Sequence, residues 1–179
     1  MTNPKSEFLR PLIATCFGLG NSPIMPGTCG ALLGPAIYIP LAWLVRTEPL
    51  QTALIAVALL AWSWITVALG GWAESYYQKK DSQAFVTDEV AGFLFTVLLF
   101  HDPANPILTT LWAFPVIRII DIVKIPPAKQ LEKLPRGWGV LADDLLGSVY
   151  AAISLYGIWI ALRYLGIEPV IRPCIMNLS

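Results

Sequence analysis

Two pairs of neighbouring acidic residues are each followed, one helical turn later, by a glycine. The pairs with their glycines are Asp88-Glu89 with Gly92 and Asp143-Asp144 with Gly147. Each pair stands at the start of an apolar stretch of the chain. Because glycine has no side chain, two helices can approach closely there and bring their carboxylates together. The pattern therefore predicts that the four acids converge where two helices meet.

Converging carboxylates repel one another unless a cation lies between them. Neither pair has a histidine or cysteine beside it, and oxygen ligands alone select hard cations, Mg²⁺ before Ca²⁺ or Mn²⁺. We predict that Asp88, Glu89, Asp143 and Asp144 hold Mg²⁺. The alternative is that the acids cap the N-terminal ends of two helices, where the helix dipole favours negative charge. Capping accounts for one acid in each helix but not for the doubling of both.

Further charged residues extend this chemistry. Asp81 precedes Asp88 by about two helical turns and could add a ligand or line the entrance. Arg118, Asp121 and Lys124 follow one another along a single helical stripe. We interpret Arg118 and Lys124 as a clamp for a phosphate, and Asp81 or Asp121 as the carboxylate that activates an attacking water. A stripe of ion pairs that satisfies itself is the alternative.

Residues 18–30 form a third polar element, rich in glycine and proline and placed just ahead of an apolar stretch. Free backbone N–H groups and hydroxyl groups in such a loop suit an anion. The loop residues that we expect to contact a substrate are Gly20, Ser22, Pro26, Gly27 and Thr28. The segment matches no known phosphate-loop pattern, so a plain connecting loop is the alternative.

Several kinds of catalysis have no residues to support them. His101, the single histidine, lies in a turn that we place on the face opposite the acids. The cysteines lack the following arginine of a thiolate phosphatase, and no serine–histidine pair or Asp-x-Asp motif supports covalent catalysis. Metal-assisted hydrolysis remains, in which a carboxylate serves as the base.

The composition places this chemistry at a membrane. Of the 179 residues, 56% are hydrophobic and 13% are charged, with a mean hydropathy of +0.63. A soluble domain typically has about 45–50% apolar and about 25% charged residues. The formal net charge is zero, which argues against a nucleic-acid partner. No pattern in the sequence defines the oligomeric state.

Apolar stretches predict an all-helical bundle embedded in the membrane as a single domain over residues 1–179. The expected spans are residues 30–45, 50–73 and 145–162, with residues 90–117 as a helical pair split by the turn His101–Pro106. Pro35 and Pro40 predict that the first span is tilted, kinked or partly re-entrant. Lysine and arginine gather in the polar segments on the side of the acids, which by the positive-inside rule places that side in the cytoplasm.

The three polar elements together resemble the phosphatidylglycerophosphatase A family. The resemblance covers residues 18–155 and rests on Pro-Gly-Thr, Val-Thr-Asp-Glu-Val-Ala-Gly, Arg-Ile-Ile-Asp-Ile-Val-Lys and Gly-Trp-Gly-Val-Leu-Ala-Asp-Asp-Leu-Leu-Gly, in that order. It implies a Mg²⁺-dependent phosphatase of the inner membrane that converts the phospholipid phosphatidylglycerophosphate to phosphatidylglycerol and phosphate. It also implies that the family acids are Asp81, Asp88, Glu89, Asp121, Asp143 and Asp144, and that its basic pair is Arg118 and Lys124.

Two positions depart from the family pattern at the edge of the headgroup pocket. Ile125 stands where a proline usually follows the lysine, and Ile117 where an aromatic residue usually precedes the arginine. Two other functions stay open: a transport protein with the acids as its ion path, and a membrane scaffold in which they only cap helices. An ion path needs acids spread through the depth of the membrane, whereas these gather at helix ends on one face.

Overall fold

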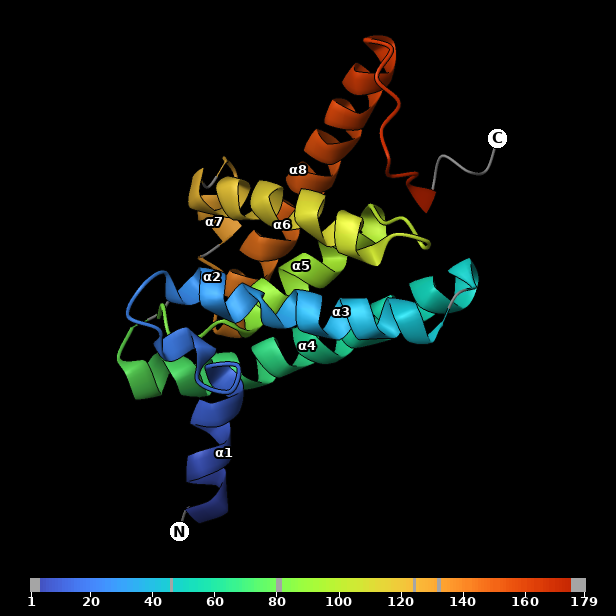
Figure 1. Ribbon diagram of the computed structural model, residues 1–179. Helices are drawn as coiled ribbons and strands as arrows, with labels where there is room; N and C mark the ends of the chain where they lie inside the picture. Colours follow the sequence, from blue (N-terminus) through green and yellow to red (C-terminus); the bar gives the residue numbers. More distant parts are fainter. Residues whose placement is uncertain (1–3, 46, 80–81, 124, 132, 175–179) are drawn as a thin grey trace.

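Figure 1 shows the computed structural model, which describes residues 4–45, 47–79, 82–123, 125–131 and 133–174. Within these residues the fold is helical and contains no strand, which confirms the predicted all-α class. The elements are α1 (Pro4–Ala14), a 3₁₀ turn η1 (Leu19–Asn21), α2 (Pro26–Ala31), α3 (Leu33–Leu44), α4 (Glu48–Tyr77), α5 (Thr87–Leu99), α6 (Pro106–Val123), α7 (Ala128–Leu131) and α8 (Gly137–Tyr164).

Four segments in the described part of the chain are long and apolar enough to cross a membrane. They are Pro26–Leu44, which joins α2 and α3, and the helices α4, α6 and α8. Helix α6 continues to Val123, beyond the expected end of the split pair at residue 117. Helix α5 has 13 residues, about 20 Å of helix against a hydrocarbon core of about 30 Å. It is therefore too short to cross on its own.

The first span is interrupted just before Pro35, but Pro40 lies inside the continuous helix α3. Helix α2 ends at Ala31 and α3 begins at Leu33. Pro35 has no backbone N–H to donate to the carbonyl of Ala31, one turn earlier, and its ring crowds that carbonyl. Figure 1 shows α3 continuing the direction of α2 and lying beside α4, while α1 runs crosswise to both.

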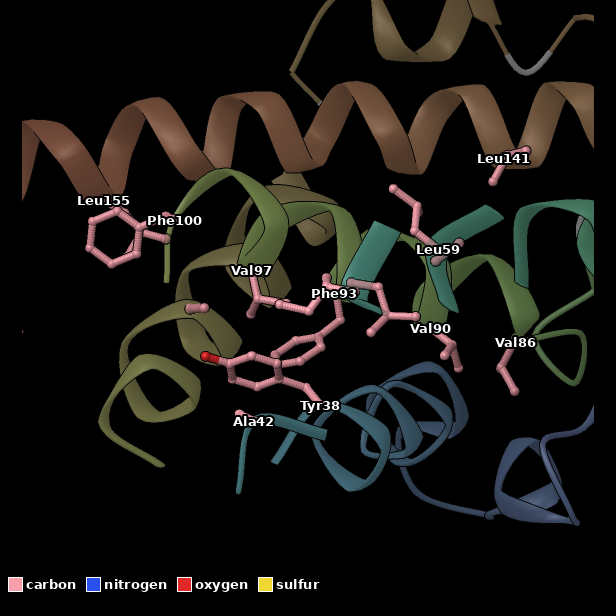
Figure 2. Close-up of a cluster of buried hydrophobic side chains, with 14 of the residues drawn as sticks. Tyr38, Ala42, Leu59, Val86, Val90, Phe93, Val97, Phe100, Leu141 and Leu155 are labelled. Atoms are coloured by element: carbon pink, nitrogen blue, oxygen red, sulfur yellow. The ribbon is translucent and has the colours of Figure 1, made fainter. Parts of the chain in front are cut away.

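The short helix α5 lies at the centre of the bundle, where it contacts α2, α3, α4, α6 and α8. Its apolar side chains form the core drawn in Figure 2, among them the fully buried Val90, Phe93 and Val97. The ring of Phe93 meets that of Tyr38 edge to face, with the ring centroids 6.3 Å apart. Because every side of α5 is covered, its sequence is apolar all round after its first turn.

Small and hydroxylated residues hold the first turn of α5 between α4 and α8. The Thr66 hydroxyl of α4 donates a hydrogen bond to the Thr87 hydroxyl at 3.0 Å. From α8, Ser148 Oγ donates to the carbonyl oxygen of Gly92 at 2.7 Å. A Cβ on Gly92 would lie 3.3 Å from Ser148 Oγ and 3.5 Å from the Cβ of Asp144, so α5 and α8 are close at this glycine, as the sequence predicts.

The C-terminal tail covers the opposite end of the bundle. Beyond α8 the chain turns back, as Figure 1 shows, toward the turn between α5 and α6. Trp159 Nε1 donates to the carbonyl oxygen of Ile171 at 2.8 Å, and the backbone N–H of Arg172 donates to Asp102 Oδ2 at 2.9 Å. The backbone N–H of Cys174 donates to the carbonyl oxygen of His101 at 2.9 Å. The turn that holds the only histidine is thus packed beneath the tail, away from the acids.

Candidate active site

A cavity of about 640 Å³ lies between the first turn of α2, the first turn of α5, the last turns of α6 and the first turns of α8. Residues far apart in the sequence meet here because α2, α5 and α8 all begin at this end of the bundle, where α6 ends. The lining includes Pro26, Gly27, Thr28, Asp88, Glu89, Arg118, Asp121, Lys133, Asp143 and Asp144. The cavity therefore collects residues from all three polar elements of the sequence.

Three carboxylates, each from a different helix, converge in this cavity. Glu89 of α5, Asp121 of α6 and Asp144 of α8 each offer one oxygen, and these oxygens lie within 4.8 Å of one another. Asp88 and Asp143 line the same cavity and are 5% and 7% exposed. All four acids of the two pairs line this cavity, and Asp121, which the sequence suggests as a base, offers an oxygen within 4.8 Å of those of Glu89 and Asp144.

The two acid pairs occupy different positions on their helices. Asp88 and Glu89 lie in the first turn of α5, but α8 begins at Gly137, and Asp143 and Asp144 follow after about two turns. The expectation that both pairs stand at a helix start is therefore wrong for the second pair. Since the effect of the helix dipole fades within the first turn, capping does not account for Asp143 and Asp144.

The first residue of α8 is packed against α4. A Cβ on Gly137 would collide with the carbonyl oxygen of Thr66, and one on Gly70 would collide with the Gly137 backbone. These two glycines let the α4 and α8 backbones touch at the first turn of α8, ahead of the apolar stretch that begins at Leu145. The hydropathy pattern does not reveal this contact, since it depends on α4.

Arg118 links the converging acids. Its Nη1 forms a hydrogen-bonded ion pair with Glu89 Oε2, and its Nη2 lies 3.2 Å from Asp121 Oδ2. Its Nε is buried and donates to no acceptor among the residues that the structure describes. The i,i+3 ion pair of the alternative reading is thus present, but Arg118 also reaches across to α5. Lys124 and Asp81, the other charged residues of the prediction, lie outside the described residues.

The Pro-Gly-Thr segment is helical and not a loop. Pro26 occupies the first turn of α2, after Met25 with a left-handed φ of 50°. A Cβ on Gly27 would collide with Glu89 Oε1 and lie 3.1 Å from Arg118 Nη2. The backbone of Gly27 therefore lies directly against the ion pair, and a side chain at this position would displace the Glu89 carboxylate.

Two residues expected to contact a substrate do not line this cavity. Gly20 is buried against the carbonyl oxygen of Ala84 and the Val86 side chain, and Ser22 Oγ donates to the carbonyl oxygen of Ile24 at 3.0 Å. The 3₁₀ turn η1 carries both away from the acids, so they shape the segment that leads into α2. Conversely, Lys133 lines the cavity although no spacing in the sequence connects it with the acids.

The nearby thiol of Cys16 is not a nucleophile. It is fully buried, and burial, with smaller contributions from Asp88 and Glu89, raises the pKa of Cys16 to about 12. The thiol therefore stays neutral at physiological pH, and a neutral thiol attacks poorly. This agrees with the absence of a thiolate phosphatase motif.

The charges in the cavity do not balance. Among the described lining residues, five carboxylates face the two cations Arg118 and Lys133. Two unit charges 4 Å apart interact with about 4 kcal/mol at an effective dielectric constant of 20. An anion such as a phosphate would be repelled from this cavity unless a further cation entered with it.

Residues 12–159 match the family of phosphatidylglycerophosphatase A. The chain belongs to this family. A phosphatidylglycerophosphatase A of Haemophilus influenzae is 33% identical over 162 residues, which cover 86% of this chain and 92% of the relative. That of Escherichia coli is 30% identical over 146 residues, covering 81% of this chain and 80% of the relative. A Bacteroides thetaiotaomicron protein named "Putative phosphatidylinositol-3-phosphatase" is 35% identical over 155 residues, covering 84% of this chain and 94% of the relative.

No solved structure matches the chain. The family match includes the three polar elements and ends at residue 159, so the C-terminal tail lies outside it. Family membership identifies the chain as a phosphatase with membrane-spanning helices, and it does not favour a transport protein. The carboxylates and Arg118 described above are the residues from which such a site can be built.

Proposed function

We propose that this phosphatase hydrolyses the terminal phosphomonoester of phosphatidylglycerophosphate, releasing phosphatidylglycerol and phosphate, and that it requires Mg²⁺. One observation carries the proposal: carboxylates of α5, α6 and α8 converge around Arg118 in a cavity with an excess of negative charge. An anionic substrate can enter such a cavity only together with a cation. The names of the Haemophilus influenzae and Escherichia coli relatives support the choice of lipid.

The donor set fits Mg²⁺. Glu89 and Asp144 offer oxygens within 4.8 Å of each other and of Asp121, and Mg²⁺ prefers a few carboxylates completed by water and substrate phosphate. Asp88 and Asp143, in the same cavity, belong to the ligand set that the sequence predicts. When bound, Mg²⁺ neutralises phosphate charge and makes a bound water more acidic.

Arg118 would bind the phosphoryl group. Its guanidinium carries five N–H donors in a planar fork, and the Glu89 and Asp121 contacts leave Nε without an acceptor within the described chain. We assign Lys124 as the second cation of the clamp, from its place one turn beyond Asp121. Charge on the equatorial phosphoryl oxygens is what such donors stabilise in phosphoryl transfer.

Hydrolysis then requires a base. A water oxygen attacks phosphorus and gives a proton to the base, the bond from phosphorus to the glycerol oxygen breaks, and that oxygen takes up a proton from solvent water, to which the base returns its own. Asp121, which lines the cavity, and Asp81 are the carboxylates that we propose for accepting the proton of the water. The alkyl chains of the lipid take no part and stay in the bilayer.

We propose that the site faces the cytoplasm at the inner membrane. Described cations at the site end of the bundle include Lys79, Lys133 and Arg136, whereas Arg163 and Arg172 lie at or beyond the opposite end of α8. The positive-inside rule places the more basic side in the cytoplasm. Phosphatidylglycerophosphate made on the cytoplasmic leaflet would then reach the site without crossing the bilayer.

Phosphate release from phosphatidylglycerophosphate in detergent micelles, measured against Mg²⁺ concentration, tests this proposal. Asp144→Asn keeps the shape of the side chain and removes its charge, so we expect turnover to fall by more than about tenfold. Glu168→Gln, at an exposed position in the tail, is the matched control and should behave like the unaltered protein. Turnover that needs no divalent cation, or full activity in Asp144→Asn, would refute the metal site.

The same assay should include phosphatidylinositol 3-phosphate as a second substrate, because the Bacteroides thetaiotaomicron relative is named for this lipid. Phosphatidylinositol 3-phosphate, presented in identical micelles, competes for the same cavity if the headgroup pocket accepts an inositol ring. Faster hydrolysis of this lipid than of phosphatidylglycerophosphate would reassign the substrate while leaving the site residues as proposed.

A further inference from the structure

The main cavity reaches the surface of the protein at the lining residues that are themselves exposed. Within the described chain these residues, which we call the mouth of the cavity, are Met25, Gln83, Ile122 and Lys133. Two of them are polar and two are apolar. The mouth therefore presents two different surfaces to a molecule that enters the cavity.

The apolar half of the mouth lies between two segments that can cross a membrane. Met25, which is 56% exposed, directly precedes the segment Pro26–Leu44, and Ile122, which is 64% exposed, lies in the last turn of α6. Figure 1 shows the start of α2 and the end of α6 at the same end of the bundle. Ile24, beside Met25, is also exposed and extends this apolar surface.

One side of α6 leads along the helix to this half of the mouth. Ile107, Leu111, Ile119 and Ile122 are exposed, and their spacing places them along one side of the helix. Because α6 is apolar enough to cross a membrane, an exposed apolar side of it faces lipid chains. Ile122 also lines the cavity and follows Arg118 by one helical turn. The lipid-facing side of α6 and the arginine of the candidate site therefore meet at Ile122.

The cavity has room for the headgroup of a phospholipid. Its volume of about 640 Å³ lies within the range of about 300–1,000 Å³ that is usual for small-molecule sites. The acyl chains have reason to stay outside, because each methylene that leaves an apolar environment for water costs free energy. A phospholipid whose terminal phosphate is in the cavity must then cross the mouth with its diacylglycerol end directed toward the bilayer.

We propose that Met25 and Ile122 contact the diacylglycerol end of the phospholipid substrate, so that the lipid enters the cavity sideways from the bilayer. This inference rests on the proposed function. The terminal phosphate lies at Arg118, and the polar residues Gln83 and Lys133 form the side of the mouth that faces water. The two apolar contacts favour a phosphomonoester that carries acyl chains over the same headgroup without them.

Polar substitutions at the apolar half of the mouth test this assignment. Ile122→Gln and Met25→Gln keep a side chain of similar length and remove its apolar end. Val123→Gln is the matched control, because Val123 is the next residue of α6, is 62% exposed and does not line the cavity. Each variant is assayed with phosphatidylglycerophosphate in micelles and with its deacylated, water-soluble headgroup, and its unfolding temperature is measured.

We expect Ile122→Gln and Met25→Gln each to raise KM for the lipid by about tenfold, as the loss of an apolar contact does. The value of kcat should change by less than about twofold, since the contact is made equally before and during the reaction. Neither variant should alter kcat/KM for the deacylated headgroup by more than about twofold. Val123→Gln should behave like the unaltered protein on both substrates.

Three results would overturn the proposal: an unchanged KM for the lipid in Ile122→Gln, an equal loss on both substrates, or an equal rise of KM in Val123→Gln. If the unaltered protein hydrolyses only the lipid, the comparison of Ile122→Gln with Val123→Gln on that lipid decides. If it hydrolyses neither substrate with Mg²⁺, the proposed function fails instead.

Photolabelling gives a readout that does not depend on turnover. The unaltered protein is irradiated with a phosphonate analogue of the lipid that carries a diazirine beside one acyl carbonyl, and the labelled residues are identified by mass spectrometry. Labels at residues 24–25 or 119–122 support the proposal. Labels confined to Gln83 and Lys133, or to α1 or α4, would place the diacylglycerol end elsewhere and overturn it.

Discussion

Substitution of Gly27 by alanine should separate catalysis from stability. The added methyl group would collide with Glu89 Oε1 and approach Arg118 Nη2 at 3.1 Å. Because the obstacle is the end of a flexible side chain, the Glu89 carboxylate can swing away while the helices stay in place. The change therefore displaces one of the three converging carboxylates and breaks its ion pair with Arg118, without removing any charged group from the protein.

The size of the effect follows from that ion pair. Its side chains are only 12% and 15% exposed, and a hydrogen bond to a charged group contributes about 1.5–3 kcal/mol. If that interaction is fully expressed in the transition state, kcat/KM falls about 10- to 150-fold. The folded state also loses part of this interaction, and alanine, as the better helix former, returns about 0.5–1 kcal/mol, so stability should fall by no more than about 2 kcal/mol.

The assay is phosphate release from lipid micelles across a series of Mg²⁺ concentrations, paired with thermal unfolding in the same detergent. Gly157→Ala is the control, as its methyl group would meet open space. We expect lower turnover and a higher Mg²⁺ requirement in Gly27→Ala, with an unfolding temperature only a few degrees below that of the control, so that the variant is still folded in the assay. Unchanged turnover would refute the placement of Glu89 in the site. If turnover falls only in proportion to the fraction of unfolded protein, the substitution acts on stability and not on catalysis.

Two further predictions concern the frame around the site. Gly70→Ala should destabilise the protein by about 1–3 kcal/mol, because its methyl group would collide with the Gly137 backbone. Thermal unfolding of this variant is compared with that of Gly157→Ala. Equal stability of the two would contradict the contact of α4 with α8. At the other end, burial lowers the pKa of His101, so stability should be full above the unfolded value of about 6.5 and fall as the pH drops below it. The unfolding temperature at successive pH values should show this decline in the unaltered protein, and His101→Gln should lose it; an identical pH profile in both would mean that another group is responsible.

Much of the fold could be predicted because bilayer insertion depends on local properties of the chain. Charge-free stretches such as residues 50–73 are long enough to cross the hydrocarbon core, and Pro35 lacks the N–H that would continue α2 into α3. The pairing of scarce acids with Gly92 also indicated a close helix contact, and the structure has it. In each case the physical cause is contained within a few neighbouring residues.

The arrangement of the site depends on contacts between residues far apart in the chain. Helix α8 begins about two turns before the second acid pair, where Gly137 meets Gly70 of α4, and no pattern within either stretch indicates this contact. The position of Gly27 against Glu89 likewise follows from how α2 lies across α5.

The sequence by itself determined that this chain is a helical membrane protein with few charged residues. It also indicated that the acidic residues gather at one end of the bundle. Only the tertiary structure decided which oxygens meet: those of Glu89, Asp121 and Asp144, from three helices whose relative rotation no local pattern encodes. The reason is that hydropathy and helix propensity act over a few turns, whereas the distance between two carboxylates on different helices depends on how every intervening side chain packs.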